Sequence, residues 1–287
     1  VVPTGGTTAG GPVYIYGFYS GYVAYNSYYD AYYTTLIDAF AANAQDITTT
    51  ITLLADCGTF EDEDGTVAYT AYTANNITLD LNGHHALGRI VNSGGTFTLE
   101  LNGGTLDYHT GATTAAAAYK GMAAVINSGS MTVKDTAGGG KLTTDAISSS
   151  SGTSGSAVIR NNAGATLTVT GKDADHLLPL EQKQNVNANN YGIFNLGTIT
   201  ALTNVDMFSA GSASIFNYGG TITTIDGLTI DGKNGIVNRN IVSGAIASGY
   251  SVTNENKGII DTIENCHIEV GQYAINNHAV INSLTGS

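Results

Sequence analysis

The chain lacks tryptophan and is poor in proline, cysteine and charge, with 3 prolines, 2 cysteines and 11% charged residues in 287 positions. A charged share of about half the usual 25% argues against long helices built from Lys, Glu and Arg. So few prolines exclude a proline-rich stalk. No run of about 18 apolar residues is present, so we expect no insertion into a membrane.

Positive charge is especially scarce. Ten Lys plus Arg stand against 23 Asp plus Glu, which gives a net charge of −13. This balance repels phosphate backbones and anionic lipids, so we expect no nucleic-acid or membrane partner. The two cysteines, Cys57 and Cys266, would lie near opposite ends of an elongated fold, too far apart for a disulfide. We therefore predict both to be free and buried.

What the chain does contain is a repeat: aliphatic or aromatic residues, then Asn, a glycine-bearing turn and Thr-x-Thr or a near match. The clearest copies are residues 89–98, 125–132, 192–200 and 214–223, with a looser copy at 158–168. Such a period is typical of stacked supersecondary units. We take one asparagine per unit as a landmark: Asn92, Asn127, Asn162, Asn195, Asn217, Asn238 and Asn277.

The spacing of these landmarks predicts a right-handed parallel β-helix, an all-β solenoid. The steps are 35, 35, 33, 22, 21 and 39 residues, and the short ones match one coil of three short strands. Longer steps are then one coil plus an excursion, and we interpret the step of 39 as two coils. The excursions, residues 109–121, 147–156 and 172–191, share one phase, which would place them on one side of the solenoid, often the binding side.

Stacking explains the residue types of the repeat. Because coils lie about 4.8 Å apart, equivalent residues form columns, and an Asn at each turn can pass its amide hydrogen bonds along as a ladder. Glycines after it would take the positive φ of a corner. Alternation along the strands sends Phe97, Leu99, Ile199 and Ile222 inward and leaves the threonines outside.

Residues 1–46 form a distinct N-terminal segment before the β-helix of residues 47–287. Nine of the 17 tyrosines lie within residues 13–33. In residues 34–43, Leu36, Ile37, Phe40 and Ala41 recur at helical spacing behind a threonine that can cap the first turn. We predict a short helix that covers the open end of the first coil.

Three runs carry a resemblance to a known family: residues 33–43, Ile51-Thr-Leu-Leu-Ala-Asp-Cys57 and Ile77-Thr-Leu-Asp-Leu-Asn-Gly-His84, followed by the Ile-x-Asn-x-Gly-Thr-Ile-Thr copies. From about Tyr33 to its end the chain resembles pectate-lyase-like right-handed parallel β-helix modules in large surface proteins of Gram-positive gut bacteria. The resemblance implies a non-catalytic, adhesin-like module at the bacterial cell surface. We also expect the polypeptide to continue beyond Ser287.

The enzymes of this scaffold, polysaccharide lyases and glycoside hydrolases, need clustered acids on adjacent coils. None of the hydrolases' Asn-Thr-Asp, Asp-Asp, Gly-His-Gly or Arg-Ile-Lys signatures occurs. The acidic run at residues 61–65 lacks EF-hand spacing, and the six histidines show no zinc-binding spacing. We therefore predict no catalytic residue, metal or cofactor, and keep an enzyme as the alternative.

The tyrosine-rich segment offers candidate binding residues. Aromatic faces stack on sugars and dominate protein interfaces, so Tyr14, Tyr16, Tyr19 and Tyr22 are candidates for contact with a host or environmental glycan or protein. The same rings could instead cover the first coil, and the module could act as a stalk. An ice-binding solenoid is a further alternative, but the outward threonine array is broken at Ser130 and Ile241, and β-propensity explains outward threonines.

Overall fold

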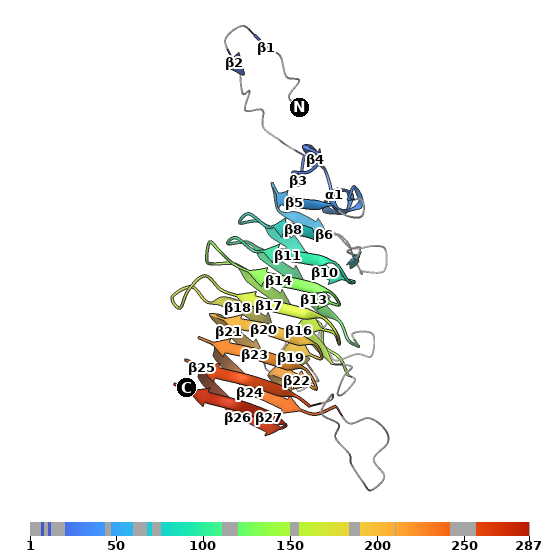
Figure 1. Cartoon of the computed structure of the whole chain (residues 1–287). Helices are drawn as coiled ribbons and strands as arrows, with labels where there is room; N and C mark the ends of the chain where they lie inside the picture. The colour runs from blue at the N-terminus through green and yellow to red at the C-terminus, as the bar shows by residue number, and fades with distance from the viewer. Residues whose placement is uncertain are drawn as a thin grey trace.

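The computed structural model describes residues 21–43, 47–59, 76–110, 120–149, 155–183, 190–209, 211–241 and 257–286, and strand residues 7–8, 11–12 and 68–70. In these residues strands predominate, and parallel sheets stack into one elongated column (Figure 1). The chain is the all-β, right-handed parallel β-helix that the repeat predicts. β1 (Thr7–Thr8) and β2 (Gly11–Pro12) form a separate antiparallel pair.

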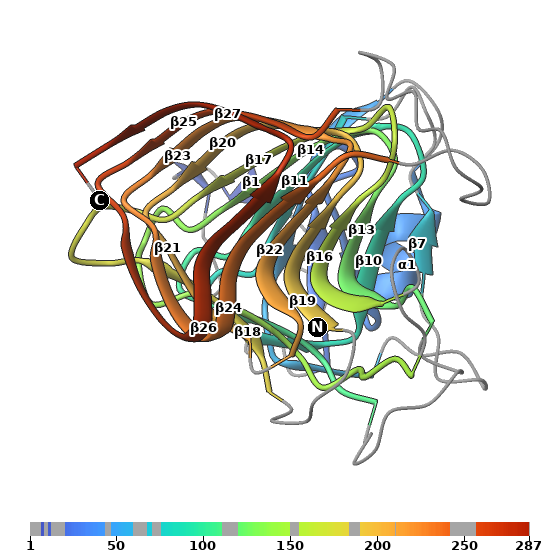
Figure 2. The ribbon, with the colours of Figure 1, turned by 90° about the horizontal axis from the view of Figure 1, so that it is seen from below.

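Each full coil contributes strands to three stacks (Figure 2). The threonine sheet contains β5 (Thr48–Leu53), β8 (Asn76–Asp80), β11 (Thr96–Glu100), β14 (Ser130–Lys134), β17 (Thr166–Thr170), β20 (Thr198–Thr203), β23 (Thr221–Asp226), β25 (Ile259–Glu264) and β27 (Val280–Thr285). The other sheet has two limbs that join in β24 (Thr229–Arg239), which pairs with β26 (His267–His278).

The acidic limb is named after three carboxylates that it carries, Glu181, Asp206 and Asp231. It contains β6 (Cys57–Thr59), β9 (His85–Leu87), β12 (Thr105–Tyr108), β15 (Lys141–Thr144), β18 (Leu178–Gln182), β21 (Val205–Ser209) and the first part of β24. The aromatic limb contains β7 (Ala68–Thr70), β10 (Arg89–Asn92), β13 (Ala123–Asn127), β16 (Ser156–Asn161), β19 (Asn190–Asn195), β22 (Ala213–Tyr218) and the second part of β24.

The predicted coil length is confirmed where little or no insert interrupts the coil. Asn76 aligns with Thr96, 20 positions further on, and Ile259 aligns with Val280 after 21. The prediction of two coils in the last step is wrong. Asn238 aligns directly with Asn277, because β24 and β26 are neighbours, so these 39 residues are one coil with an insert.

Two of the three predicted excursions leave the solenoid at the same corner. Residues 109–121 and 147–156 both connect the acidic limb to the aromatic limb. Residues 172–191 do not form one excursion, because they contain β18, which pairs with both neighbouring coils. Residues 240–258 connect β24 to β25, so this insert enters the sequence between the aromatic limb and the threonine sheet.

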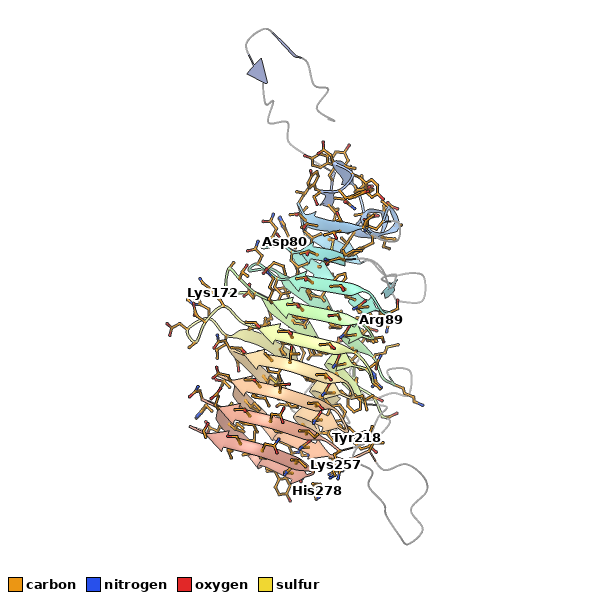
Figure 3. All side chains as sticks on the ribbon, viewed as in Figure 1. Asp80, Arg89, Lys172, Tyr218, Lys257 and His278 are labelled. Carbon is orange, nitrogen blue, oxygen red and sulfur yellow. The ribbon has the colours of Figure 1, made fainter. Side chains whose placement is uncertain are left out.

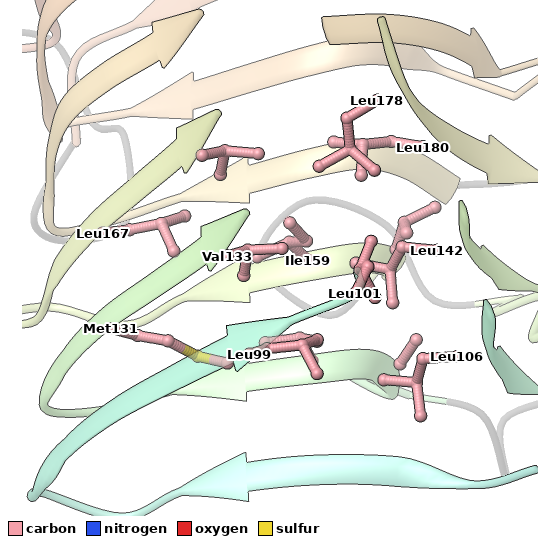
Figure 4. Packing of buried hydrophobic residues seen from close by; sticks show 14 of the residues in the cluster. Leu99, Leu101, Leu106, Met131, Val133, Leu142, Ile159, Leu167, Leu178 and Leu180 are labelled. Atoms are coloured by element: carbon pink, nitrogen blue, oxygen red, sulfur yellow. The ribbon is translucent and has the colours of Figure 1, made fainter. Parts of the chain in front are cut away.

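A narrow apolar core fills the solenoid, as the alternation predicts. Phe97, Leu99, Ile199 and Ile222 are fully buried. Figure 4 shows part of the core, in which Leu99 lies in register with Val133 on the next coil. Each fully buried side chain of this size stabilises the fold by about 1.5–3 kcal/mol relative to exposure. The core is thus a set of stacked aliphatic columns.

An asparagine ladder runs along the corner where the aromatic limb meets the threonine sheet. From Asn92 to Asn238, each side-chain amide donates from Nδ2 to Oδ1 of the asparagine on the next coil, at 2.8–2.9 Å. The members are Asn92, Asn127, Asn161, Asn195, Asn217, Asn238 and Asn277. All except Asn277 are fully buried.

The ladder corrects one prediction: Asn161 is the member, and Asn162 is not. Ladder asparagines come two residues after an inward aliphatic residue, which here is Ile159. Alternation therefore turns Asn161 inward and Asn162 outward. The Asn162 amide instead donates to the Ser128 hydroxyl at 2.8 Å.

At two corners the glycine that follows a ladder asparagine does not serve to adopt a positive φ, which was its predicted role. Gly129 and Gly197 do not have positive φ. A Cβ on Gly129 would lie 2.4 Å from the carbonyl oxygen of Gly95, and one on Gly197 would lie 2.4 Å from that of Ala165. Glycine is needed at these positions because adjacent coils approach closely.

The N-terminal end is closed by a helix, as predicted. α1 (Leu36–Ala41) begins after Thr35, whose hydroxyl accepts a hydrogen bond from the Asp38 backbone N–H at 3.1 Å. The buried residues of α1 are Leu36, Ala39 and Phe40, whereas Ile37 is 44% exposed, so the buried face differs from the predicted one. An antiparallel hairpin of β3 (Ala24–Asn26) and β4 (Ala31–Tyr33) pairs with β5 beside it.

Candidate functional site

The predicted tyrosine site is only partly within the described residues. Tyr14, Tyr16 and Tyr19 lie outside them, as does the acidic run at residues 61–65. Tyr22 is half-buried, and its ring centroid lies 5.7 Å from that of Tyr32 in β4. Tyr22 therefore packs against the hairpin that covers the first coil.

A second group of aromatic side chains lies on the outer surface of the aromatic limb. Register places Arg160, Phe194, Phe216, Val237 and Asn276 in one column over five successive coils. These residues immediately precede ladder asparagines, so alternation turns them away from the core. The apolar ones, Phe194, Phe216 and Val237, belong to a cluster that is separate from the core.

The rings of this cluster contact one another across coils. Tyr191 stacks on Phe216 with centroids 4.9 Å apart and planes 12° apart, and Phe194 lies 5.5 Å from Phe216. Tyr218 continues the stack at 5.7 Å from Phe216. Ring contacts of this kind contribute about 0.5–1.5 kcal/mol beyond area burial, so they fix the rings in position.

All three arginines of the chain lie over aromatic rings. Arg160 lies 4.7 Å from the Phe194 centroid, and Arg239 lies 6.0 Å from that of Phe216. Arg89 is over Tyr108 at 5.7 Å. Figure 3 shows Arg89 and Tyr218 on one side of the solenoid, with Asp80 and Lys172 on the other. The aromatic limb therefore carries the arginines of an otherwise acidic chain.

An open hollow of about 390 Å³ lies on this surface at the C-terminal coils. Rings from three coils border it: Tyr191, Phe216 and Tyr273. Side-chain amides and one cation complete the border: Asn234, Gln272, Asn276 and Arg239. Its size and mixed lining are typical of small-ligand sites.

Several polar groups of the hollow have unused hydrogen-bonding capacity within the described part of the chain. Asn234 is 9% exposed; its Nδ2 donates to the Ser212 carbonyl at 2.7 Å, and its buried Oδ1 has no partner. The side-chain amides of Gln272 and Asn276 form no hydrogen bond there. An unpaired buried acceptor costs about 1–3 kcal/mol, which a donor reaching it would recover.

Tyr191 takes part in this surface as a neutral group. Burial raises the pKa of Tyr191 to about 12, although Arg239 and a hydrogen bond with Ser212 act in the opposite direction. The hydroxyl therefore stays protonated at neutral pH, and the ring presents an apolar face.

The acidic limb brings together carboxylates that the sequence motifs did not single out. Burial raises the pKa of Asp206, and the nearby Asp231 and Glu181 raise it further. These three residues come from β21, β24 and β18, neighbouring strands of the limb. Among the described residues, no group of three or more His, Cys, Asp or Glu side chains is arranged to hold a metal ion.

The threonine sheet carries an outward hydroxyl column that is regular over only part of its length. Thr50, Thr78, Thr98, Thr132 and Thr168 are in register on successive coils. The register then shifts at a bulge, which aligns Ala201 with Thr168. Ser130 lies in a neighbouring column, and Ile241, the other predicted break, lies outside this sheet. The hydroxyl column is therefore interrupted at Ala201 and resumes with Thr224, Thr262 and Ser283 on the following coils.

No protein-family model, curated protein or solved structure matches this chain. Among the described residues, no helix has the length and hydropathy needed to span a bilayer. The hollow on the aromatic limb is consequently defined by its own geometry and chemistry. Phe194 and Phe216 could have been assigned to an outer surface from the sequence, because each immediately precedes an inward asparagine.

Proposed function

We propose that this protein is a non-catalytic, adhesin-like module of the bacterial cell surface that binds a glycan in the hollow of the aromatic limb. The observation that carries the proposal is a hollow bordered by Tyr191, Phe216 and Tyr273 together with amides that have unused hydrogen-bonding capacity. Sugars present an apolar C–H face and a rim of hydroxyls, which match aromatic rings and side-chain amides.

The rigidity of the scaffold supports binding. Strand-borne side chains such as Phe216 and Asn234 are positioned by sheet hydrogen bonds and by ring stacking across coils. A site that is already ordered loses little conformational entropy when a ligand binds. The composition, rich in Thr, Ser, Asn and Gly and poor in Lys, agrees with an extracellular location.

A glycan array with the purified chain tests this proposal, and Tyr273→Ala is the informative variant. Tyr273 borders the hollow and is 58% exposed, so its removal should leave the fold intact and weaken binding about tenfold or more. Tyr28→Ala is the matched control, because Tyr28 is also 58% exposed but lies at the hairpin near the first coil. Equal loss of binding in both variants, or no glycan bound by the wild type, would contradict the proposal.

A polysaccharide hydrolase or lyase is the second candidate, and Asp206 is the observation in its favour. A carboxyl with a raised pKa beside other carboxyls has the character of a general acid. Incubation with pectin and related polysaccharides, followed by measurement of reducing ends and unsaturated products, decides between the two. Cleavage that disappears in Asp206→Asn would replace the binding module by an enzyme.

A further inference from the structure

The hollow contains the only arginine at the C-terminal end of the described coils, and this cation has no ionic partner there. Arg239 is exposed, and no ion pair joins it to any described residue. Its neighbours in register on the adjacent coils are Tyr218 and His278, neither of which is acidic.

Three lysines of the described chain form ion pairs with carboxylates. Lys134 pairs with Glu100 at 2.9 Å, Lys183 pairs with Asp107 at 2.7 Å, and Lys141 pairs with Glu181. Carboxylates greatly outnumber cations in a chain of net charge −13, so a guanidinium that borders a hollow and forms no ion pair within the described residues is open to an anionic ligand. We propose that the ligand of the hollow is a sugar residue that carries an anionic group, a carboxylate or a sulfate, bound by Arg239. This inference rests on the proposed glycan-binding function.

The guanidinium is suited to such a group. It is planar and permanently charged, and it can form two parallel hydrogen bonds to a carboxylate or a sulfate. Its position near the Phe216 ring, 6.0 Å from the centroid, restricts its orientation. A neutral sugar would use the rings and amides but would leave this charge unmatched.

Register defines the space for the sugar. Tyr191 aligns with Ala213, and Asn234 aligns with Tyr273. Ile215 aligns with Ile236, which places Asn234 on the coil after Ala213. Tyr191 and Tyr273 are thus three coils apart, about 14 Å at the usual strand spacing. The Phe216 ring stacks on Tyr191 at one end of this gap, and Ala213 and Asn234 contribute short side chains between the coils. The gap accommodates a sugar ring, with Arg239 at its border.

The amides supply the complementary contacts. Gln272 and Asn276 can donate to and accept from ring hydroxyls, and Asn234 contributes an acceptor that is unpaired in the described chain. An anionic sugar carries the hydroxyl donors and the charge within one residue, so it can satisfy these groups and Arg239 together. Acidic peptides share the charge but lack the dense hydroxyl rim.

The experiment measures affinity by calorimetry for four probes. Two are anionic, a glucuronic-acid oligosaccharide and a galactan sulfated on its sugars, and two are their neutral counterparts, a glucose and a galactose oligosaccharide. We expect at least one anionic probe to bind about tenfold or more tightly than its neutral counterpart. Arg239→Gln should abolish that difference in affinity between the anionic and the neutral probes, and Arg239→Lys should retain part of it. The preferred anionic probe then identifies the group as carboxylate or sulfate.

Controls separate failure of this inference from failure of the proposed function. Lys172→Gln removes a cation from the opposite side of the solenoid and should leave all affinities unchanged (Figure 3). Thermal melting checks that each variant is folded. Equal binding of neutral and anionic probes that is insensitive to Arg239→Gln overturns the inference but leaves glycan binding in place. Binding of an acidic peptide with no glycan bound overturns both.

Discussion

Replacing Asn161 by alanine should destabilise the solenoid far more than the same change at Asn162, its neighbour in sequence. The Asn161 amide donates to Asn195 Oδ1 at 2.8 Å and to the Thr198 carbonyl at 3.1 Å. Its own Oδ1 accepts from Asn127 Nδ2 at 2.9 Å. At about 1 kcal/mol for each hydrogen bond, the loss is about 3 kcal/mol.

The penalty for orphaned groups adds little to this figure. Asn127 Nδ2 keeps the carbonyls of Gly129 and Thr166, and Asn195 Oδ1 keeps the Gly197 N–H. Asn162, by contrast, bonds to Ser128 and to Arg160 near the surface, where water replaces the lost partners. Its removal should cost about 0.5 kcal/mol, within the range of ordinary surface substitutions.

Urea unfolding followed by circular dichroism measures the comparison. Repeat proteins can unfold in parts. The unfolding midpoints should therefore be compared between variants whose unfolding free energies depend equally on urea concentration. A clear fall of the midpoint in Asn161→Ala and almost none in Asn162→Ala is expected. Equal midpoints, or the larger fall in Asn162→Ala, would refute the assignment of ladder stability to the inward asparagine.

Three further predictions concern titratable groups. Burial raises the pKa of Cys57 to about 11, so its thiol should alkylate at least about tenfold more slowly in the folded protein than in urea, and equal rates would contradict this. Burial acts to raise the pKa of Asp107, but Lys183 and Thr143 outweigh it and leave that pKa lowered. The stability that this carboxylate contributes is present above about pH 4 and is lost as the pH falls. Lys183→Met should therefore lower the free energy of unfolding by about 1 kcal/mol near neutral pH and by little in acid. An equal loss at both pH values would argue against the ion pair. The pKa of Asp206 is raised in the folded protein, so its protonated form stabilises the fold below about pH 4. This contribution is lost as the pH rises and the carboxyl ionises. Asp206→Asn should therefore raise the urea midpoint near neutral pH but not in acid.

The repeat itself was predictable because it depends on local chemistry. Alternation in Thr-Phe-Thr and Thr-Ile-Thr placed Phe97 and Ile222 inside, and helical spacing after Thr35 placed α1. The turn asparagines form the predicted ladder. Each of these features needs only a few neighbouring residues and the fixed spacing of strands.

Register across inserts was harder to predict. The prediction of Asn162 as a ladder member is wrong because Asn161 and Asn162 are adjacent, and only Ile159 as the inward reference identifies Asn161 as the inward residue. The step of 39 residues from Asn238 to Asn277 predicts two coils, but length alone does not distinguish an extra coil from an insert. Only the pairing partner of a strand decides to which coil it belongs.

A second kind of corner, between the threonine sheet and the acidic limb, was not predicted from the sequence. Asn82 and Asn102 have φ values of 49° and 47°, and each is followed by a glycine with φ of 79°. The repeated Leu-Asn-Gly triplets at these positions are typical of tight turns with two left-handed residues. They turn the chain from the threonine sheet into the acidic limb.

The sequence by itself determined the repeating architecture of this protein: strands in which inward and outward residues alternate, asparagines and glycines at corners, and an acidic charge balance. Each of these features follows from residues that are close together in the chain. The tertiary structure alone decided where the surface is hollow. Tyr191, Arg239 and Tyr273 are brought to one hollow by the stacking of four coils. The length of each insert sets which residues become neighbours, and that length has no signature in the local pattern.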